Sequence, residues 1–467
     1  MWKNRAYAIA LLAFLIRVAL GGFALVYLPT LPTGSEPQKA GYLFYDAFHR
    51  DSQAWELAAS GESLFSAFSE KRSSDQYGGL LFILSALYRA IPVGTHFPML
   101  TILLSALVAA LGVLAFIAMA KEFLPEKAAL LLGVLFATYP ESVLLGASQM
   151  REPYLISLVA VFLYGMVLAG KGTALKGYSI TLAALIGTIL VSPGIALPLI
   201  LIAAGWFSFG ALKHGLPVKK ITLTLLILII LGIIALGIIS SSWESVVSYK
   251  GGGVLGVLGE WAKRTAQYNA YLLKQSSGIV QVMLGALPSW LAFPFVAIYG
   301  LLQPVLPAVL FEPGEVFWKV IGFLRAAGWY TLLPLLMVFP FALKTAPAGT
   351  KRSQWYWLFL VAVVWLFVSS LRGGGDQWDN PRYRTILLPA LMLLATILLA
   401  QLDLNGKVWL KRIFAIEAFD LLLFCHWYSW RYTGWGFDLG IRNTILLAIA
   451  GSLLLLFIIK KPKPTGL

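Results

Sequence analysis

Cysteine, histidine and acidic side chains are scarce in this chain of 467 residues. Its one cysteine, Cys425, excludes an intramolecular disulfide and a CxxC redox site. Its four dispersed histidines form no HExxH zinc motif. Charged residues make up 12% of the chain, against roughly a quarter in a soluble domain, and apolar residues make up 59%. These shortages exclude a soluble globular fold and argue against thiol redox or zinc chemistry.

The shortage of acids leaves 36 Lys and Arg against 21 Asp and Glu, a net charge of +15. A basic balance of this size is one signature of a nucleic-acid partner. Here, however, the basic residues lie mainly at the ends of apolar blocks, which is the distribution that membrane topology requires. We therefore expect a membrane protein with no nucleic-acid partner.

The apolar residues come in blocks of about 20, each sufficient for a helix that crosses the hydrocarbon core of a bilayer. The first block is too long for a signal-peptide core, and no small-residue cleavage site follows it. We expect about twelve spans, near residues 6–28, 97–120, 128–148, 154–170, 178–192, 194–212, 221–241, 320–343, 355–371, 383–402, 413–430 and 442–459. The expected fold is an all-α, polytopic transmembrane helical bundle that forms a single integral membrane domain over residues 1–467.

The positive-inside rule gives this bundle an orientation. Basic residues precede the first span, so the N-terminus is expected in the cytoplasm, and the basic clusters of the short connections then fall on the same side. Two large segments, 29–96 and 242–319, are expected outside. Within them, the apolar stretch 78–91 is short for a span, and four prolines interrupt the stretch 284–311. We expect external juxtamembrane or re-entrant helices there, without a crossing.

A polar stretch in the first external segment, 45–61, holds the first candidate site. Apolar residues recur at helical spacing from Ser52 onward, which predicts a helix with Asp51 or Ser52 as its N-cap. The competing interpretation is catalytic: Asp51 is a carboxylate at the membrane face that serves as a general base. Asp46 and His49, in the same stretch, are candidates for binding substrate.

A second acid, Glu152, lies between two predicted spans on the same side. Pro153 suits the first turn of a helix, and Glu152 suits its N-terminal dipole, with Arg151 as an ion-pair partner. The functional interpretation is a two-carboxylate site with Asp51. One acid is then the base, and the other positions the acceptor or holds a divalent cation, while Arg151 binds substrate.

A third polar group, 372–384, leads into a predicted span near the C-terminal end. Arg382 and Arg384, with Tyr383 between them, lie where lipid head groups are expected. Guanidinium groups match phosphate oxygens bidentately, so these three residues are candidates for binding a lipid phosphate. The structural alternative is ordinary snorkelling of the two arginines to the membrane interface.

Taken together, these groups resemble the motifs of the C-type glycosyltransferase superfamily of integral membrane enzymes, which includes the protein O-mannosyltransferases and the aminoarabinose transferase of lipid A. The pattern Asp51-Ser52-x-x-Trp55-x-x-Ala58-Ala59-x-Gly61 is similar to the acidic motif of the family's first external loop. Other stretches resemble the juxtamembrane helix, the second acidic motif and the late arginine-tyrosine span: 76–81 with 86–89, 150–153, and 382–384 with 387–389. The likeness covers about residues 1–170 and returns near 380–400.

The resemblance implies an enzyme that moves a sugar from a polyprenyl-phosphate-linked donor to a lipid, glycan or protein acceptor. Transfer would take place outside the cytoplasmic membrane, usually with inversion at the anomeric carbon. It implies that Asp51 deprotonates the acceptor and that Glu152 positions the acceptor or a metal. It also implies that Arg382 and Arg384 stabilise the departing phosphate. A divalent cation is the one cofactor that this scheme leaves open.

One departure from the family pattern concerns the donor phosphate. Many relatives carry Lys-Pro where this chain has Asp75-Gln76. Lys71, Arg72 or the late arginines would then have to meet the phosphate.

Two other functions remain open at this stage. A transporter or flippase of lipid-linked saccharides would also explain the spans and the buried charges. A polysaccharide polymerase would use the same kind of donor but would depend chiefly on external arginines. Asp51 and Glu152 within about 10 Å over one external cavity would favour an enzyme, because catalytic groups must converge.

Overall fold

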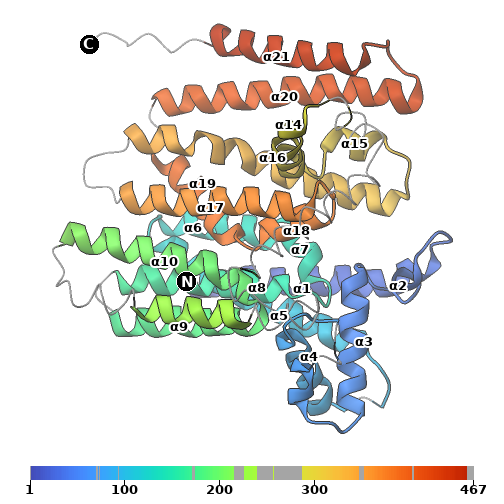
Figure 1. Cartoon of the computed structure of the whole chain (residues 1–467), viewed down its shortest axis with the longest axis vertical. Coiled ribbons are helices and arrows are strands. Elements are labelled where there is room, and N and C mark those ends of the chain that lie inside the picture. Colours follow the sequence, from blue (N-terminus) through green and yellow to red (C-terminus); the bar gives the residue numbers. More distant parts are fainter. Residues whose placement is uncertain are drawn as a thin grey trace. The chain divides into compact units, whose positions relative to one another are not determined.

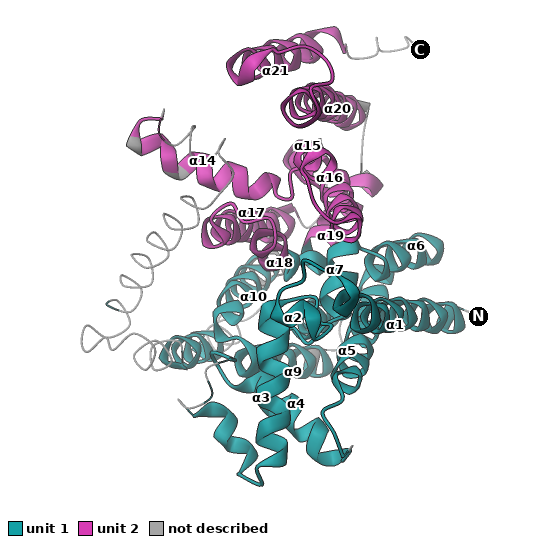
Figure 2. Ribbon diagram, turned by 90° about the vertical axis from the view of Figure 1, so that its right-hand side faces the viewer, with its two compact units in different colours: residues 1–268, 385–390 teal, residues 269–384, 391–467 magenta. Residues whose placement is uncertain are grey.

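The computed structural model describes residues 2–69, 72, 74–92, 94–170, 174–214, 226–238, 256, 285, 287–345, 352–401 and 404–459. Every regular element in these ranges is a helix, drawn in Figure 1. The chain packs as two compact units, Met1–Tyr268 with Thr385–Ala390 and Asn269–Arg384 with Leu391–Leu467 (Figure 2). The prediction of an all-α fold is confirmed.

Seven helices of the described residues are long and apolar enough to cross a membrane, and two bent pairs raise the number to nine if each pair is one span. The remaining predicted spans also contain helices, over Ala174–Val191, Leu226–Ile238 and Leu404–Thr433. The chain is a multi-pass membrane protein. The count of twelve spans stays a prediction.

The first unit is built around a bundle of helices that run side by side in Figure 1. Helix α5 packs against α1 and α8, and α8 packs against α9. Their close approach relies on small residues: a Cβ at Gly112 of α5 would meet the side chain of Ser157 of α8. The bundle comprises α1 (Trp2–Tyr27), α5 (Pro98–Lys121), α6 (Glu126–Ala137), α7 (Pro140–Gly146), α8 (Glu152–Ala169), α9 (Ala174–Val191) and α10 (Pro193–His214).

A buried arginine of α1, Arg17, bonds to both helices at the 56° bend between α6 and α7. Arg17 is 1% exposed, and its Nη1 donates to the carbonyl oxygens of Ala13 and Ala137, each at 2.9 Å. Its Nη2 donates to the hydroxyl of Ser142 in α7 at 3.0 Å. Because Ala137 ends α6, its carbonyl has no partner within the helix. Arg17 therefore satisfies backbone that the bend leaves open.

We expect Arg17→Met to lower the free energy of unfolding by about 2–3 kcal/mol, because the buried carbonyl and hydroxyl groups lose their donor. Thermal unfolding in detergent micelles measures the effect. The matched control is Arg5→Met, which removes an exposed arginine from the same helix. Equal melting temperatures for the two variants would contradict the role given to Arg17.

The segment between α1 and α5 forms a small lobe at one end of the bundle. Helices α3 and α4 pack together and run across the bundle axes in both ribbon views (Figures 1 and 2). The 12 residues of α4 extend roughly 18 Å, too little to cross a core of about 30 Å. The helix predicted at 78–91 is thus present and short. The lobe comprises η1 (Leu28–Thr30), α2 (Glu36–Lys39), α3 (Tyr45–Ala59), η2 (Leu64–Phe68) and α4 (Gly79–Ala90).

The predicted start of α3 is wrong. The helix begins at Tyr45, not Ser52, and Asp51 lies in its middle, so the N-cap interpretation of Asp51 is wrong too. The buried face of α3 contains charged as well as apolar residues. The spacing of apolar residues alone therefore does not reveal the first two turns of the helix. Its buried residues are Ala47, Arg50, Asp51, Ala54 and Leu57. The helix ends at Ala59, and Gly61 follows it with a φ of +72°, a conformation that favours glycine.

The second unit is also a helical bundle. Helix α14 packs on α17, and α20 packs on α15, α16 and α21. The proline-rich stretch 284–311 forms the two short helices α14 and α15, as expected. Most of 242–286 lies outside the described residues, so the second external segment stays a prediction, as does the single membrane domain. The elements are α14 (Ser289–Leu302), α15 (Leu306–Phe311), α16 (Val316–Thr345), α17 (Arg352–Gly373), α18 (Asp379–Thr385), α19 (Leu388–Gln401), α20 (Leu404–Thr433) and α21 (Gly440–Ile458).

Candidate functional site

The carboxylate of Asp51 is fully buried and is the acceptor of four hydrogen bonds. Its Oδ1 accepts from the hydroxyls of Tyr88 at 2.9 Å and Thr101 at 2.7 Å. Its Oδ2 accepts from the hydroxyl of Tyr42 at 2.7 Å and from Nε2 of His96 at 2.8 Å. The donors come from the segment before α3, from α4, from the segment before α5, and from α5 itself. The side chain of Asp51 thus joins four parts of the chain.

This arrangement satisfies an ionised carboxylate. Two carboxylate oxygens offer about four acceptor positions, and four donors occupy them. The hydroxyls of Tyr88 and Thr101 also approach backbone carbonyls, but their contacts with Asp51 are the shorter ones. Burial, followed by the negative charge of Asp51, raises the pKa of both Tyr42 and Tyr88. Both phenols therefore remain protonated donors.

His96 is the only one of the four donors that reaches the surface. Its side chain is 28% exposed, whereas the other three donors are buried. The imidazole stacks on the indole of Trp55, with ring centroids 5.8 Å apart, and meets the ring of Tyr88 edge-on at 5.7 Å. The rings of Trp55 and Tyr88 also contact each other, with centroids 5.4 Å apart, so the three rings form one packed group around the most exposed donor to Asp51.

A second charged group of α3, Arg50, connects the lobe to the segment before α8. Its Nη2 lies 3.2 Å from Oδ2 of Asp46, and its Nη1 contacts the sulfur of Met150 at 3.5 Å. Its Nε donates to the carbonyl of Ser74 at 3.3 Å. Asp46, predicted to bind substrate, is therefore engaged in an ion pair with a buried arginine.

Several charges surround Arg50. Burial lowers its pKa, and the positive charge of Arg151 lowers it further. Three carboxylates oppose this shift: Asp46, Asp75 and Glu152. We call these five residues the charged cluster. Asp75 also starts α4, since its Oδ2 accepts from the backbone N–H groups of Leu80 and Leu81 at 2.9 and 3.2 Å.

The two predicted acids belong to adjoining parts of the first unit. Gln149 donates to the carbonyl of Pro98 at 3.2 Å, one turn before Thr101, which bonds to Asp51. Glu152 is fully buried at the start of α8, with Pro153 in the first turn, so the predicted helix start is confirmed. The structure therefore brings the segment of Glu152 to the helix of Asp51, and both carboxylates are buried rather than open to solvent.

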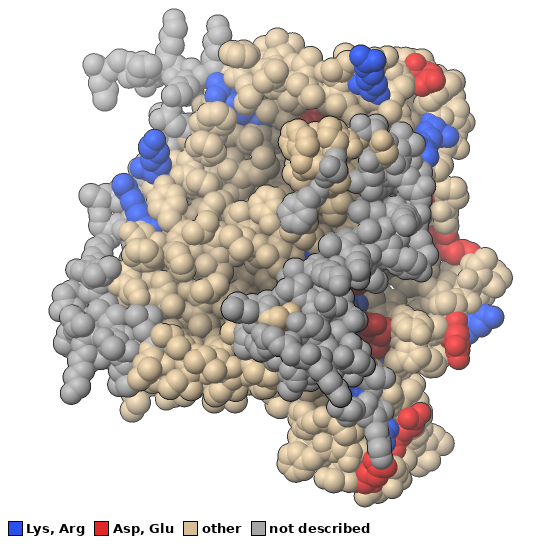
Figure 3. All heavy atoms as spheres, viewed as in Figure 1, with Lys and Arg blue, Asp and Glu red and all other residues tan. Residues whose placement is uncertain are grey.

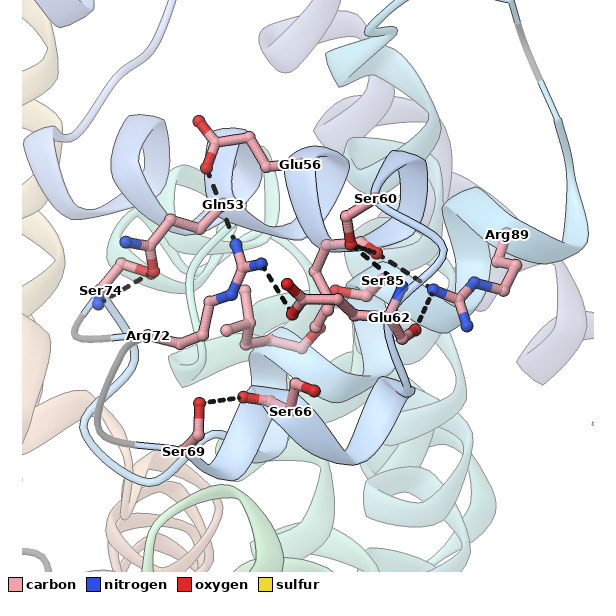
Figure 4. A network of polar contacts seen from close by, with 12 residues as sticks. Gln53, Glu56, Ser60, Glu62, Ser66, Ser69, Arg72, Ser74, Ser85 and Arg89 are labelled. Carbon is pink, nitrogen blue, oxygen red and sulfur yellow. Dashed lines mark hydrogen bonds and ion pairs between the residues drawn. The ribbon is translucent and has the colours of Figure 1, made fainter.

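Other residues predicted to bind substrate from this lobe contact neighbouring protein groups. His49 is half-buried, and its ring packs on those of Tyr45 and Phe48. Arg72 lies between Glu56 at 3.7 Å and Glu62 at 3.4 Å, as Figure 4 shows. Lys71 lies outside the described residues. Arg72 therefore serves to tie the loop before α4 to α3.

The surface of the lobe carries charges of both signs. On the face drawn in Figure 3, Asp and Glu atoms lie over the elements α2 to α4, with Lys and Arg atoms beside them. The exposed acids are Glu36, Glu56 and Glu62, and the exposed basic residues include Lys39 and Arg89. Glu56 and Glu62 are paired with Arg72, which offsets part of their charge.

The late arginines are buried among aromatic rings of the second unit. Arg384 is 3% exposed, donates from Nη1 to the carbonyl of Leu301 at 2.9 Å, and lies 3.8 Å from the ring centre of Trp329. Arg382, 7% exposed, pairs with Asp379 at 3.5 Å and bonds to the hydroxyl of Tyr383 at 3.1 Å. Since both are buried, snorkelling to the interface does not describe them.

Two further arginines accompany them. Arg372 lies over the ring of Tyr383 at 4.6 Å, and Arg325 lies over the ring of Trp378 at 4.5 Å. We call Arg325, Arg372, Arg382 and Arg384 the arginine cluster. Cations held over aromatic faces keep fixed positions, which is what recognition of an anion requires. The cluster retains the chemistry of a phosphate site.

Each unit also contains a largely apolar cavity. In the first unit, a cavity of about 290 Å³ is bordered by α4, α5, α8 and α9 and reaches Tyr154 and Ser157. In the second unit, a cavity of about 410 Å³ is bordered by α14, α15, α16, α20 and α21 and includes Glu417 and Asp420. Both have the lining that a hydrocarbon chain requires.

No three His, Cys, Asp or Glu side chains among the described residues are grouped so that they could hold a metal ion. The carboxylate of Asp51 is instead bonded to its four donors. The surroundings of Asp51 therefore do not fit a divalent cation.

Sequence reasoning missed four residues of the site: Tyr42, Tyr88, His96 and Thr101. They lie 9 to 50 positions from Asp51, and one sequence contains no record of such contacts. A weak signal existed for His96. It is one of only four histidines, and it lies just before a predicted span in the same external segment as Asp51.

Comparison with known proteins gives structural likeness only. No family model and no curated protein matches the chain. Its structure is similar to that of ArnT from Cupriavidus metallidurans bound to undecaprenyl phosphate, with 15% identity, a TM-score of 0.45, and coverage of 98% of this chain and 70% of that one. It is also similar to the oligosaccharyltransferase AglB from Archaeoglobus fulgidus in complex with an inhibitory peptide and a dolichol-phosphate, with 15% identity, a TM-score of 0.43, and coverage of 96% and 56%.

A second structure of an Archaeoglobus fulgidus oligosaccharyltransferase, tethered to an acceptor peptide, gives 14% identity and a TM-score of 0.45. The match covers 96% of this chain and 55% of that one, so the chain spans little more than half the length of the oligosaccharyltransferases. A function for the chain has to rest on its own residues.

Proposed function

We propose that the chain is a membrane glycosyltransferase that moves a sugar from a polyprenyl-phosphate-linked donor to a hydroxyl group of a lipid, glycan or protein. The reaction takes place at the extracytoplasmic face of the cytoplasmic membrane, where the positive-inside rule places the lobe. The observation that carries the proposal is Asp51. It occupies the position of the acidic motif that the sequence resembles, and it is a fully buried carboxylate held by four donors at one end of the bundle.

The residues divide the chemistry between them. Asp51 supplies the negative charge on which deprotonation of the acceptor depends, and general-base assistance contributes about 10²–10⁴ in rate. Glu152, in the charged cluster, positions the acceptor. Arg382 and Arg384 stabilise the charge that develops on the departing phosphate. The apolar cavities suit the isoprenoid chain of the donor.

The test is turnover by the purified chain in proteoliposomes. Labelled polyprenyl-phosphate hexoses and pentoses are supplied with acceptor lipids, glycans or peptides, and both the released polyprenyl phosphate and the glycosylated acceptor are measured. Transfer by the wild type supports the proposal. Movement of the labelled lipid between leaflets, with no cleavage of any donor, would overturn it in favour of a flippase.

Arg72→Gln concerns a residue that the sequence offered as a contact of the donor phosphate. Here we expect almost no loss of activity. We expect kcat/KM to change less than about twofold and the free energy of unfolding to fall by about 0–1 kcal/mol, because its partners Glu56 and Glu62 are solvent-exposed. Donor titration of the rate and thermal unfolding measure the two effects. A rise of KM for the donor by tenfold or more would return Arg72 to the phosphate site.

A further inference from the structure

We infer that His96, through Nδ1, receives the proton of the acceptor hydroxyl and that Asp51 acts through His96 as a positioning residue. This inference deepens the proposed function and rests on it. Four hydrogen-bond donors already surround the carboxylate of Asp51. An acceptor hydroxyl that approached this carboxylate directly would have to displace one of four donors at 2.7–2.9 Å and enter a fully buried position.

The hydrogen bond to Asp51 determines which nitrogen of His96 is basic. A carboxylate only accepts hydrogen bonds, so Nε2, at 2.8 Å from Oδ2, carries the hydrogen of the neutral imidazole. The other nitrogen, Nδ1, then has a lone pair. Nδ1 has no hydrogen-bond partner among the residues that the structure describes, and the side chain is 28% exposed. The basic atom is therefore the one that no described residue occupies.

The surroundings of the imidazole suit a group that gains charge during the reaction. Trp55 of α3 stacks on one side, and Tyr88 of α4 contributes its ring edge-on. The titratable groups that face His96 are Asp51 of α3, Tyr88 of α4 and, through the shared Oδ2, Tyr42. Only Asp51 carries a charge, and its sign favours an imidazolium. Its four bonds hold that charge in place, so little reorganisation accompanies protonation.

The transfer step balances with these groups. The acceptor O–H bond breaks and its proton moves to Nδ1. The acceptor oxygen forms a bond to the anomeric carbon while the bond from that carbon to the phosphate oxygen breaks. The electron pair of that bond leaves on the phosphate, which turns the donor phosphodiester into polyprenyl monophosphate. The imidazolium, paired with Asp51, afterwards returns its proton to water.

The first experiment uses His96→Gln in the proteoliposome assay. The amide nitrogen of glutamine replaces Nε2 as a donor to Asp51, but glutamine offers no basic atom in place of Nδ1. We expect kcat/KM to fall about 10²–10³-fold, with the melting temperature kept. In the wild type, kcat/KM should fall at acid pH, because a general base acts only in its unprotonated form. That acid limb should be absent from the residual rate of the variant.

Two variants separate a proton acceptor from a structural histidine. His96→Ala removes the ring, and added imidazole should restore part of the rate, a rescue that a purely structural role does not give. Tyr88→Phe removes a different donor from the same carboxylate and leaves Nδ1 in place. We expect it to reduce kcat/KM less than about tenfold and to keep the acid limb.

Wild-type turnover combined with a His96→Gln rate within about threefold of it, and an unchanged pH profile, would overturn this inference and leave the proposed function intact. A wild type that cleaves no polyprenyl-linked donor would overturn the proposed function, and this inference with it.

Discussion

Asp51→Asn should lower kcat/KM by about 10²–10⁴-fold, the largest effect that we expect from a single substitution. Asparagine has nearly the same size as aspartate. Its NH₂ group, however, is a hydrogen-bond donor, and the four groups that surround this side chain are donors as well. At least one of Tyr42, Tyr88, Thr101 and His96 then loses its acceptor. The negative charge that supports protonation at His96 is lost as well. The measurement is sugar transfer in proteoliposomes over a range of donor concentrations and pH.

The same substitution should lower the free energy of unfolding by about 1–3 kcal/mol, since it leaves buried donors unsatisfied. A lower melting temperature alone would therefore not establish a role in the reaction. Glu56→Gln is the matched control, because it removes an exposed carboxylate from the same helix. A fully folded Asp51→Asn protein with the rate and pH profile of Glu56→Gln would contradict the role given to Asp51.

The sequence predicts the helical bundle because hydrocarbon imposes strong constraints on a chain. Apolar blocks of about 20 residues and basic residues at their ends leave few arrangements open, and a helix lies in each stretch predicted to span. The lobe is less constrained. Helix α3 buries the charged residues Arg50 and Asp51. The prediction assumed that buried helix residues are apolar, and it therefore began the helix seven residues too late.

The sequence predicted only part of the site, because it reveals local motifs but not contacts between residues far apart along the chain. Asp51 and Glu152 were found because their motifs are local and resemble those of a family. The partners of Asp51 were not, because Thr101 lies 50 residues away along the chain. Arg72 was proposed to bind substrate in place of the lysine of the family pattern, and His49 because it lies in the same polar stretch as Asp51. The structure engages them in ion pairs and ring packing, which only coordinates reveal.

Two members of the arginine cluster, Arg382 and Arg384, were also predicted, but not their burial. Arg384 was expected at the membrane interface. It is instead 3% exposed, and its guanidinium group lies over the ring of Trp329. Aromatic residues and arginines alternate in this part of the sequence. Such a pattern fits an interfacial belt as well as a packed cluster, so composition does not distinguish the two.

The second large effect is expected from Arg384→Gln. It should lower kcat about 10²–10³-fold, the usual result of removing one charged group that stabilises a developing anion. A cation in a buried aromatic setting acts over a low dielectric, where its effect on phosphate charge is greater than at a surface. Because the phosphate charge grows as the bond to the sugar breaks, kcat should change more than KM for the donor.

Arg384→Lys refines this prediction. Lysine keeps the charge but not the planar group that lies 3.8 Å from the ring centre of Trp329 and bonds to Leu301, so we expect only a partial recovery of kcat. Arg431→Gln is the matched control, because it removes an exposed arginine that lies over aromatic rings of the same unit but does not belong to the arginine cluster. Its rate should stay within about threefold of the wild type. If Arg384→Gln and Arg431→Gln gave the same kcat, with similar melting temperatures, Arg384 would have no role at the phosphate.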